Sequence, residues 1–474
     1  MYKKNAHIHF IGIGGIGMSG IAKILKEQGY IVSGCDTNVE NKNITILKKL
    51  GCPISKGHNT AICQQKNINI IVYSTAINLI DNTEINNAKK RSIPVIHRSK
   101  MLAEILRKKF SILISGSHGK TTTTSLIGHM LLEAKINPTI ISGGILKNQN
   151  LHSISGTSEF AVAEADESDR SLLNFLPTIA VLTNISLEHL ETYKDLDDIK
   201  ATFKKFLENI SFFGKAIVCI DNDNIKSIIK NINIPIIKYG FTDEANLTAK
   251  NVKLWPETST YELWFNNKKT TEIELQIAGK HNVLNSLAAA AIGLELDIPI
   301  ETIVKTLKSF TGVKRRFQYH GTFKGAKVFD DYGHHPIEIE HTLEVAKNNC
   351  KGNLFVIFQP HRYSRTKALW NQFIETFQNS QINNLVITDI FAASEAPIEH
   401  ITGKYLANSI KEQSKNIHVK YLPIDKNFSS ILEHLKSEVK SDDFILFLGA
   451  GKLDKAAEIA VKTYKPIKFK FESK

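Results

Sequence analysis

The chain has 474 residues, of which 42% are hydrophobic, and this length predicts two or three domains instead of one core. Its net charge of +13 comes from dispersed lysines without a helix-turn-helix or an aromatic and basic platform, so it does not indicate nucleic-acid binding. No apolar run reaches the length of a membrane span and the first residues do not resemble a signal peptide, so we expect a cytoplasmic protein without membrane insertion.

Apolar runs rich in Ile and Val alternate with helical patterns along the chain, which predicts an α/β fold with mostly parallel sheets. The predicted strands lie within residues 7–14, 31–36, 68–76, 110–116, 159–166, 179–186, 215–222, 353–360, 383–391 and 442–451. Residues 247–282 alternate between apolar and polar and predict antiparallel hairpins. The predicted domains are residues 1–107, 108–312 and 313–474.

A glycine turn follows the first predicted strand. Gly12, Gly14 and Gly17 have the spacing of the dinucleotide fingerprint, and Asp36 ends the next strand about twenty residues later. A turn of this kind binds a pyrophosphate at a helix N-terminus, whichever nucleotide carries it. An NAD-dependent oxidoreductase, another nucleotide-binding protein and a packing turn without a ligand therefore all stay open.

The five cysteines are odd in number, widely spaced and without a CxxC pair. This spacing argues against a disulfide framework and against a zinc site. We expect reduced and mostly buried thiols. They are Cys35, Cys52, Cys63, Cys219 and Cys350.

A second glycine turn, "GSHGKTT", follows the strand at residues 110–116 and opens a helix. Gly116 and Gly119 allow backbone N–H groups to surround phosphate oxygens, Lys120 can reach the terminal phosphates and Thr121 can bind Mg²⁺. Ile114 stands where the general P-loop pattern has its first glycine, so the spacing departs from that pattern. The alternative is an ordinary turn with a solvated lysine.

Four carboxylates crowd the end of the next strand, in "EADESD" from Glu164 to Asp169, and repel one another unless a cation or basic groups gather them. The following strand leads to His189 at what we expect to be the same sheet edge. Glu164 is a natural Mg²⁺ ligand and His189 a less usual one. A solvated acidic turn and a helix-capping histidine are the alternatives.

The last third of the chain carries arginines and histidines after successive strands. Arginines suit the capture of carboxylate or phosphate, and Pro336 predicts the start of a helix. The candidate residues here are Arg315, Arg316, Asp330, Asp331, His334, His335, His361, Arg362 and Arg365.

Taken in order, "GIGGIGMSG", "GSHGKTTTT", "EADESD", "TNISLEHLE", "GKHNVLN", "GVKRRF", "DDYGHHP" and "QPHRYSRT" resemble the motifs of the Mur ligases of peptidoglycan synthesis. The resemblance covers nearly the whole chain and is greatest to members that join L-alanine to UDP-N-acetylmuramate. It implies an ATP- and Mg²⁺-dependent ligase of cell-wall biogenesis that works through an acyl phosphate. It also implies an N-terminal Rossmann-like domain for the UDP-sugar, a central P-loop ATPase-like domain and a C-terminal Rossmann-like domain that closes over the site.

The resemblance further implies roles for single residues. The ATP-binding residues would be Gly116, Ser117, His118, Gly119, Lys120, Thr121, Thr122, His281, Asn282, Asn285, Arg316 and Asp331. The UDP-sugar would contact Gly12, Gly14, Gly15, Gly17, Asp36, Ser74, Thr75, His97 and Arg98. The metal ligands would be Thr121, Glu164 and His189, and the amino acid would contact Tyr332, His334, Arg362 and Arg365. The catalytic residues would be Lys120, Arg316, His334 and His361, with either histidine as the acceptor of the amine proton.

Three rival functions stay open at this point. A sister ligase attaches a recycled peptide in place of L-alanine and shares most of these motifs. A folylpolyglutamate-type synthetase shares the ATPase core but leaves the first glycine turn unexplained, whereas an NAD-dependent oxidoreductase explains only that turn. We also expect a monomer or a weak homodimer.

Overall fold

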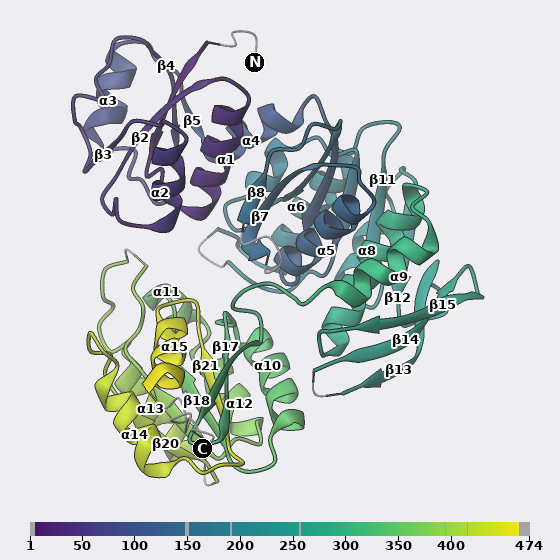
Figure 1. Cartoon of the computed structure of the whole chain (residues 1–474), viewed down its shortest axis with the longest axis vertical. Coiled ribbons are helices and arrows are strands. Elements are labelled where there is room, and N and C mark those ends of the chain that lie inside the picture. The colour runs from purple at the N-terminus through teal and green to yellow at the C-terminus, as the bar shows by residue number, and fades with distance from the viewer. Residues whose placement is uncertain are drawn as a thin grey trace, which may run out of the picture. The chain divides into compact units, whose positions relative to one another are not determined.

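The computed structural model, shown in Figure 1, describes residues 5–146, 151–189, 192–255, 257–393, 395–414 and 416–463. It confirms an α/β fold, with three sheets that are mostly parallel. The chain divides into two compact units. In the described part, the first unit runs up to Lys253 and resumes at Ser259–Val313, and the second holds Leu254–Thr258 and the chain from Lys314 onward. The predicted domain boundaries stay predictions.

The first sheet belongs to the N-terminal part of the first unit and is parallel throughout, in the order β3-β2-β1-β4-β5. Its strands are β1 His7–Ile11, β2 Ile31–Asp36, β3 Ile54–Lys56, β4 Ile68–Tyr73 and β5 Val95–His97. Its helices are α1 Ile16–Glu27, α2 Lys42–Lys49, α3 Thr83–Lys90 and α4 Arg98–Leu106. The strand order reverses between β1 and β4, where the carboxyl ends of parallel strands form ligand sites.

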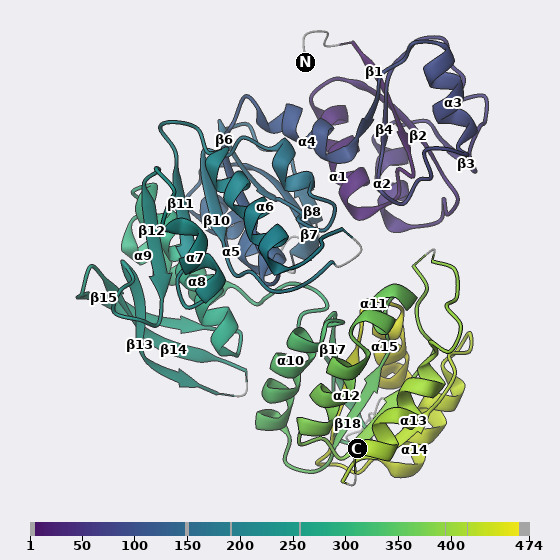
Figure 2. The same cartoon turned by 180° about the vertical axis from the view of Figure 1, so that it is seen from behind.

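The second sheet has ten strands in the order β15-β14-β13-β12-β11-β10-β6-β9-β7-β8. They are β6 Phe110–Ser115, β7 Thr139–Leu146, β8 Leu151–Ile154, β9 Phe160–Glu164, β10 Ile179–Leu182, β11 Lys215–Cys219, β12 Ile236–Gly240, β13 Leu247–Leu254, β14 Ser259–Phe265 and β15 Lys268–Leu275. The helices are α5 Lys120–Glu133, the 3₁₀ turn η1 Ser171–Asn174, α6 Leu196–Glu208, α7 Asp223–Ile229, α8 Lys280–Glu295 and α9 Ile300–Ser309. Figures 1 and 2 show α5 and α8 on one face of this sheet and α6 and α7 on the other.

Small residues bring α8 close to α5. Ala288–Ala291 are buried, and a Cβ on Gly293 would lie 2.8 Å from the sulfur of Met130 on α5. Close-packed interiors tolerate little change in volume. The helix α5, which begins at the second glycine turn, is therefore fixed by its close packing against α8.

The hairpin prediction for residues 247–282 is confirmed for β14 and β15, which pair antiparallel. β13 instead pairs in parallel with β12 and extends the main sheet. All ten predicted strand segments contain a strand, whereas β3, β5, β7, β8, β12, β16 and β20 were not predicted. Of these, β3, β5, β8 and β20 have only three or four residues, too few to display a period.

The sheet of the second unit has the order β16-β17-β21-β18-β19-β20, parallel except for the β16–β17 hairpin. Its strands are β16 Gln318–Phe323, β17 Ala326–Asp331, β18 Leu354–Phe358, β19 Asn384–Ile387, β20 His418–Tyr421 and β21 Phe444–Leu448. Its helices are α10 Pro336–Asn349, α11 Tyr363–Ala368, α12 Trp370–Asn379, α13 Gly403–Gln413, α14 Ser429–Glu438 and α15 Leu453–Thr463. Alternate residues of β18 pack against α10, α12 and α13 on one face and α14 and α15 on the other.

Candidate active site

The turn between β6 and α5 accepts only glycine at two positions. Gly116 has a φ of +134°, and a Cβ there would clash with the Thr183 side chain. Gly119 has a φ of +82°, and its Cβ would lie 2.6 Å from Oδ1 of Asn285. Larger residues are strained at such φ values. The path brings the first N–H groups of α5, which have no intrahelical acceptors, to the mouth of the turn, an arrangement typical of phosphate binding.

The end of β10 holds this turn in place. The backbone oxygen of Asn184 accepts a hydrogen bond from the Ser117 N–H at 3.0 Å, and its Oδ1 accepts one from the His118 N–H at 2.9 Å. The Thr183 hydroxyl donates to the His118 carbonyl at 2.6 Å. Thr183 and Asn184 were not among the predicted site residues, although they begin the quoted motif "TNISLEHLE".

Lys120 is charged and lies at the turn. Its Nζ donates to the carbonyls of Gly116 and Ser117, at 2.5 and 3.0 Å, and to the carboxylate of Glu167 at 2.7 Å. Burial opposes the charge, but the attraction of Glu167 and Asp166 outweighs it and raises the pKa of Lys120. The turn therefore keeps an ammonium group in position for the phosphates of a nucleotide.

Thr121 and Glu164 form one group of oxygen donors. The Thr121 hydroxyl donates to Glu164 at 3.2 Å, and the Ser142 hydroxyl and the Gly143 N–H donate to the same carboxylate at 3.2 and 2.5 Å. Burial raises the pKa of Glu164, against the lowering effects of the Gly143 N–H and of Lys120. A hydroxyl beside a buried carboxylate fits the preference of Mg²⁺ for oxygen ligands.

His189 contacts two other carboxylates. Its Nε2 lies 3.4 Å from Glu167 and 3.5 Å from Glu188, and the candidate ligand atoms of the three residues lie within 4.8 Å of one another. Oε2 of Glu167 is buried without a hydrogen-bond partner. Glu167 and Glu188 were not predicted as ligands. Metal binding by Thr121, Glu164 and His189 stays a prediction. The geometry adds Glu167 and Glu188 as further candidate ligands.

The start of α8 supports the second glycine turn. Oδ1 of Asn285 accepts from the Thr123 hydroxyl at 3.1 Å, and its Nδ2 donates to Asn282 at 3.2 Å. The Asn282 amide in turn donates to the Ala278 carbonyl at 2.7 Å. Asn285 therefore holds the turn, while the predicted contacts of His281, Asn282 and Asn285 with the nucleotide stay a prediction.

The first glycine turn lies at the carboxyl end of β1. The Gly14 N–H donates to the Asp36 carboxylate at 2.8 Å, and the Asn43 amide donates to the Gly14 carbonyl at 3.0 Å. Asp36 thus holds the turn closed from the end of β2. Its predicted contact with a ribose stays a prediction.

A basic residue lies against this turn. Ser74 and Thr75 follow β4, and His97 ends β5, so these predicted residues share the sheet edge with the turn. Arg98 begins α4, and its Nη1 would lie only 3.0 Å from a Cβ on Gly17. A guanidinium beside the N-terminus of α1 suits a diphosphate.

One carboxylate joins the two glycine turns. Asp166 accepts from Arg98 at 3.0 Å, and His97 lies 3.5 Å from Asp169. Burial opposes ionisation of Asp166, but the charges of Lys120 and Arg98 outweigh it and lower its pKa to about 2. The Asp166 carboxylate therefore interacts both with Lys120 at the second glycine turn and with Arg98 beside the first. Both glycine turns therefore lie beside one charged network in the first unit.

In the second unit, Asp331 ties two loops together at the end of β17. Its carboxylate accepts from the Phe317 N–H at 2.7 Å and from the Gly333 N–H at 2.6 Å. Burial raises its pKa to about 6, against the lowering effect of Arg316 and these N–H groups. Its predicted contact with ATP stays a prediction.

Two arginines stack on one aromatic ring. The Arg315 guanidinium lies 4.9 Å from the Tyr332 ring centroid, and that of Arg316 lies 5.4 Å from it. Arg315 also donates to the carbonyls of Gly449 and Gly451 at 2.9 and 3.0 Å, which fixes it within the fold. The predicted catalytic arginine, Arg316, also lies 3.8 Å from the Glu338 carboxylate.

His334 and His361 follow β17 and β18, and their ring centroids lie 5.5 Å apart. Nδ1 of His334 is 3.1 Å from the Tyr332 carbonyl, which only accepts, so Nδ1 carries the proton and Nε2 a lone pair. Nδ1 of His361 is 3.1 Å from the Arg365 guanidinium, which only donates, so the neutral ring has its proton on Nε2. The geometry therefore favours His334 as a proton acceptor.

Both histidines stay neutral. Burial lowers the pKa of His334 to about 3 and that of His361 to about 4, with Arg365 contributing to each. The neighbouring Arg362 lies 3.8 Å from Glu395 and begins the turn into α11. The predicted amino-acid contacts Tyr332, His334, Arg362 and Arg365 thus share one end of this sheet.

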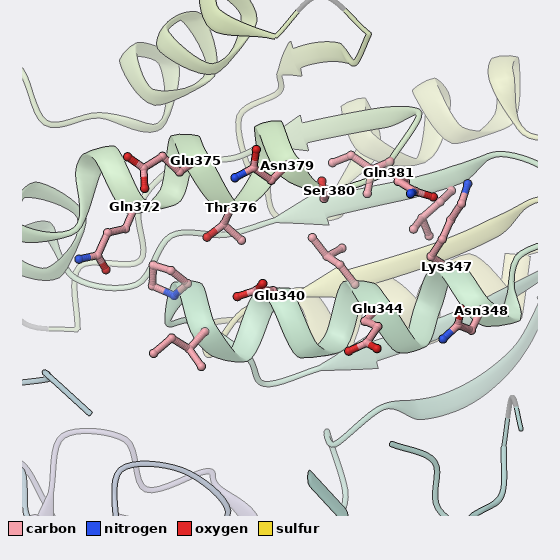
Figure 3. A pocket seen from close by; sticks show the side chains of 15 residues that line it. Glu340, Glu344, Lys347, Asn348, Gln372, Glu375, Thr376, Asn379, Ser380 and Gln381 are labelled. Atoms are coloured by element: carbon pink, nitrogen blue, oxygen red, sulfur yellow. The ribbon is translucent and has the colours of Figure 1, made fainter. Parts of the chain in front are cut away.

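A groove between α10 and α12 lies apart from this chemistry. Figure 3 shows its polar lining, which includes Glu340, Glu344 and Lys347 from α10 and Glu375 and Thr376 from α12. None of the predicted site residues lines it. The candidate site is therefore defined by the two glycine turns and the strand ends.

Three family models match the chain in order. They are the Mur ligase family catalytic domain over residues 7–110, the Mur ligase middle domain over residues 114–293 and the Mur ligase glutamate ligase domain over residues 315–451. The chain belongs to the Mur ligase family. This Mur ligase is 43% identical to the UDP-N-acetylmuramate–L-alanine ligase of Geotalea daltonii, over 98% of the chain and 99% of the relative, and 44% identical to that of Geotalea uraniireducens, over 98% and 99%.

Solved structures resemble the Mur ligase along its whole length. The UDP-N-acetylmuramate-alanine ligase of Thermotoga maritima matches with a TM-score of 0.78 and 27% identity, over 97% of this chain and 99% of that one. A murein peptide ligase of Psychrobacter arcticus matches with a TM-score of 0.71 over 98% and 100%, and its 22% identity shows the fold alone. In the described part of the Mur ligase, no helix has both the length and the apolar character of a membrane span.

Proposed function

We propose that this Mur ligase joins L-alanine to the lactyl carboxylate of UDP-N-acetylmuramate, with ATP converted to ADP and phosphate, in peptidoglycan synthesis. The network from Arg98 through Asp166 to Lys120 carries the proposal, because it connects a diphosphate-binding turn with a triphosphate-binding turn. Two turns serve two different nucleotides. We also propose that the reaction takes place in the cytoplasm. The monomer or weak homodimer stays a prediction.

The first step activates the acid. A carboxylate is a poor acyl donor, so the lactyl carboxylate attacks the γ-phosphorus of ATP, an acyl phosphate forms and ADP leaves. Lys120, fixed at the turn, and Arg316 counter the negative charge of this transfer. Thr121, Glu164, Glu167, Glu188 and His189 are the donors available for Mg²⁺, which when bound neutralises phosphate charge.

The second step forms the amide. The neutral amine of L-alanine attacks the activated carbonyl, and phosphate leaves from the tetrahedral intermediate. His334 accepts the amine proton at Nε2, the nitrogen that its bond to the Tyr332 carbonyl leaves deprotonated. Arg362 and Arg365 supply positive charge for the alanine carboxylate at the same sheet end.

The amino acid that the enzyme accepts separates this function from its rival. Phosphate release from ATP is measured with UDP-N-acetylmuramate present, across the twenty amino acids and the peptide L-alanyl-γ-D-glutamyl-meso-diaminopimelate. We expect release with L-alanine, weaker release with other small amino acids, and little with the peptide. Preference for the peptide would assign the sister activity, and amide formation without ATP consumption would overturn both.

Replacing Arg98 with alanine tests the UDP-sugar site. Arg98 lies against Gly17, so its loss removes a charged contact to the diphosphate, and we expect the Kd of UDP-N-acetylmuramate to rise about 10- to 100-fold. The Kd of ATP should change less. Calorimetric titration measures both. Arg107→Ala is the matched control, because Arg107 follows the same helix and its side chain is 73% exposed. Equal effects of the two variants would remove Arg98 from the site.

A further inference from the structure

Four side chains that none of the chemistry above uses meet inside the N-terminal part of the first unit. They are His9 on β1, Cys35 on β2, Cys63 between β3 and β4, and Glu84 on α3. One nitrogen, sulfur or oxygen atom from each lies within 4.8 Å of the others. Their exposed fractions are 0%, 0%, 6% and 3%. Such a cluster of potential ligands requires a physical explanation.

The orientation of His9 matches that of a metal ligand. Its Nδ1 lies 2.8 Å from the Ser33 hydroxyl, which fixes the ring. Its Nε2 is buried without a hydrogen-bond partner and points at the cluster, 3.7 Å from Glu84. Ligating histidines are commonly held this way, with one nitrogen bound to a neighbouring group and the other turned to the metal.

Glu84 is a buried carboxylate whose basic neighbours are histidines, with Nε2 of His9 and Nδ1 of His58 each 3.7 Å from its oxygens. Among the described residues, no lysine or arginine lies within ion-pair distance of it. Its oxygens accept from the Cys35 thiol at 3.3 and 3.4 Å and from the Asn59 N–H. A buried charge is costly unless it is paired or binds a metal. A divalent cation between Glu84 and the two sulfurs would compensate it.

Two of the separations within the cluster match those expected around a tetrahedral ion, and all lie within 4.8 Å. Zinc bonds of about 2.0–2.3 Å place ligand atoms about 3.3–3.8 Å apart. The cluster has 3.3 Å between Cys35 and Glu84 and 3.7 Å between His9 and Glu84. His58 borders it, with Nδ1 3.1 Å from the Cys35 sulfur. Two thiolates, an imidazole and a carboxylate favour zinc over Mg²⁺.

We propose that His9, Cys35, Cys63 and Glu84 bind one divalent ion of the zinc class. Each cysteine releases its thiol proton to solvent on binding. The ion would link β1, β2, α3 and the segment that carries Cys63. Because Asp36 follows Cys35 directly and holds Gly14, the same ion would steady the first glycine turn.

The absorption spectrum of bound Co²⁺ distinguishes this site from the candidate Mg²⁺ ligands at the second glycine turn. The full chain is reduced, freed of metal with a chelator and titrated with Co²⁺, then with Zn²⁺. We expect one equivalent of Co²⁺ to give thiolate charge-transfer absorption and the strong visible bands of tetrahedral cobalt, and Zn²⁺ to displace it. The carboxylate and histidine cluster around Glu167 contains no cysteine and produces no such charge-transfer band.

Substitutions assign the ligands. Cys35→Ser and Cys63→Ser should abolish the charge-transfer absorption, while Cys52→Ser, buried elsewhere in the same sheet region, should keep it. Glu84→Gln should keep the sulfur bands and weaken Co²⁺ binding about tenfold or more. Since a serine variant can fail to fold, the thermal midpoint of the unaltered protein is also measured, and zinc should raise it.

Three outcomes would overturn the proposal. The first is an absence of charge-transfer absorption in the reduced full chain. The second is absorption that survives both Cys35→Ser and Cys63→Ser. The third is a Cys35–Cys63 disulfide in the purified protein, detected as two missing thiols in denaturant, together with no cobalt uptake after reduction.

Discussion

Lys120→Met should abolish phosphate release while leaving UDP-N-acetylmuramate binding nearly intact. The substitution keeps an unbranched side chain but removes the ammonium that Gly116, Ser117 and Glu167 hold at the turn. Removal of one preorganised charge from a phosphoryl transfer costs about 10³-fold or more in kcat. Phosphate release under saturating substrates measures the loss, and calorimetry measures sugar binding.

The control for Lys120 is Lys305→Met. Lys305 lies on α9 with a side chain that is 78% exposed, so its replacement should leave turnover unchanged. The network through Asp166 predicts a small increase in the Kd of the UDP-sugar for Lys120→Met, because Arg98 then becomes the main partner of that carboxylate. Loss of sugar binding together with turnover would show that the two turns do not divide the nucleotides as proposed.

The glycine turns could be predicted from the sequence because each is local. A strand, a few glycines and a helix follow one another within about twenty residues, and the positive φ values of Gly116 and Gly119 require glycine. The connection between the turns could not be predicted. Arg98 and Asp166 are 68 residues apart, and only the packing of α4 beside the second sheet makes them partners.

Contacts of this long-range kind also leave no pattern in the sequence around the acidic residues and the cysteines. Glu188 was not predicted as a ligand, although it lies 3.5 Å from His189 after the end of β10. Its charge also acts on Lys120, which is far from it in the sequence. The cysteine spacing argued against a zinc site, whereas the proposed ligands come from four separate elements of the first sheet region. A ligand set without a local motif has no signature along the chain.

Asp36 shows a different limit. Its position after the second strand predicts a ribose contact, and the fold also gives it the Gly14 N–H at 2.8 Å. Sequence alone does not distinguish a residue that binds a ligand from one that shapes the turn around it. The same holds for Asn285 and Asp331, whose side chains hold backbone or side-chain groups of neighbouring loops.

His334→Asn should lower kcat for amide formation by about 10²- to 10⁴-fold, the range expected for a lost proton acceptor. Activation of the acid precedes amine attack, so the acyl phosphate should still form and be trapped by hydroxylamine as a hydroxamate in the presence of ATP. Quenched-flow measurement of the hydroxamate and of the amide product separates the two steps. The KM of L-alanine should change much less than kcat.

His361→Asn is the matched control, because the two rings lie 5.5 Å apart and both are neutral above about pH 4. An asparagine carbonyl at position 361 can still accept from Arg365, so this variant should raise the KM of L-alanine more than it lowers kcat.

The low pKa of His334 also determines how the reaction rate should depend on pH. The ring stays deprotonated as pH falls from neutral to about 4, so any loss of rate in that range comes from protonation of the alanine amine or other groups and persists in His334→Asn. A rate loss in this range that disappears in the variant, or equal kcat effects of the two substitutions, would contradict His334 as the acceptor.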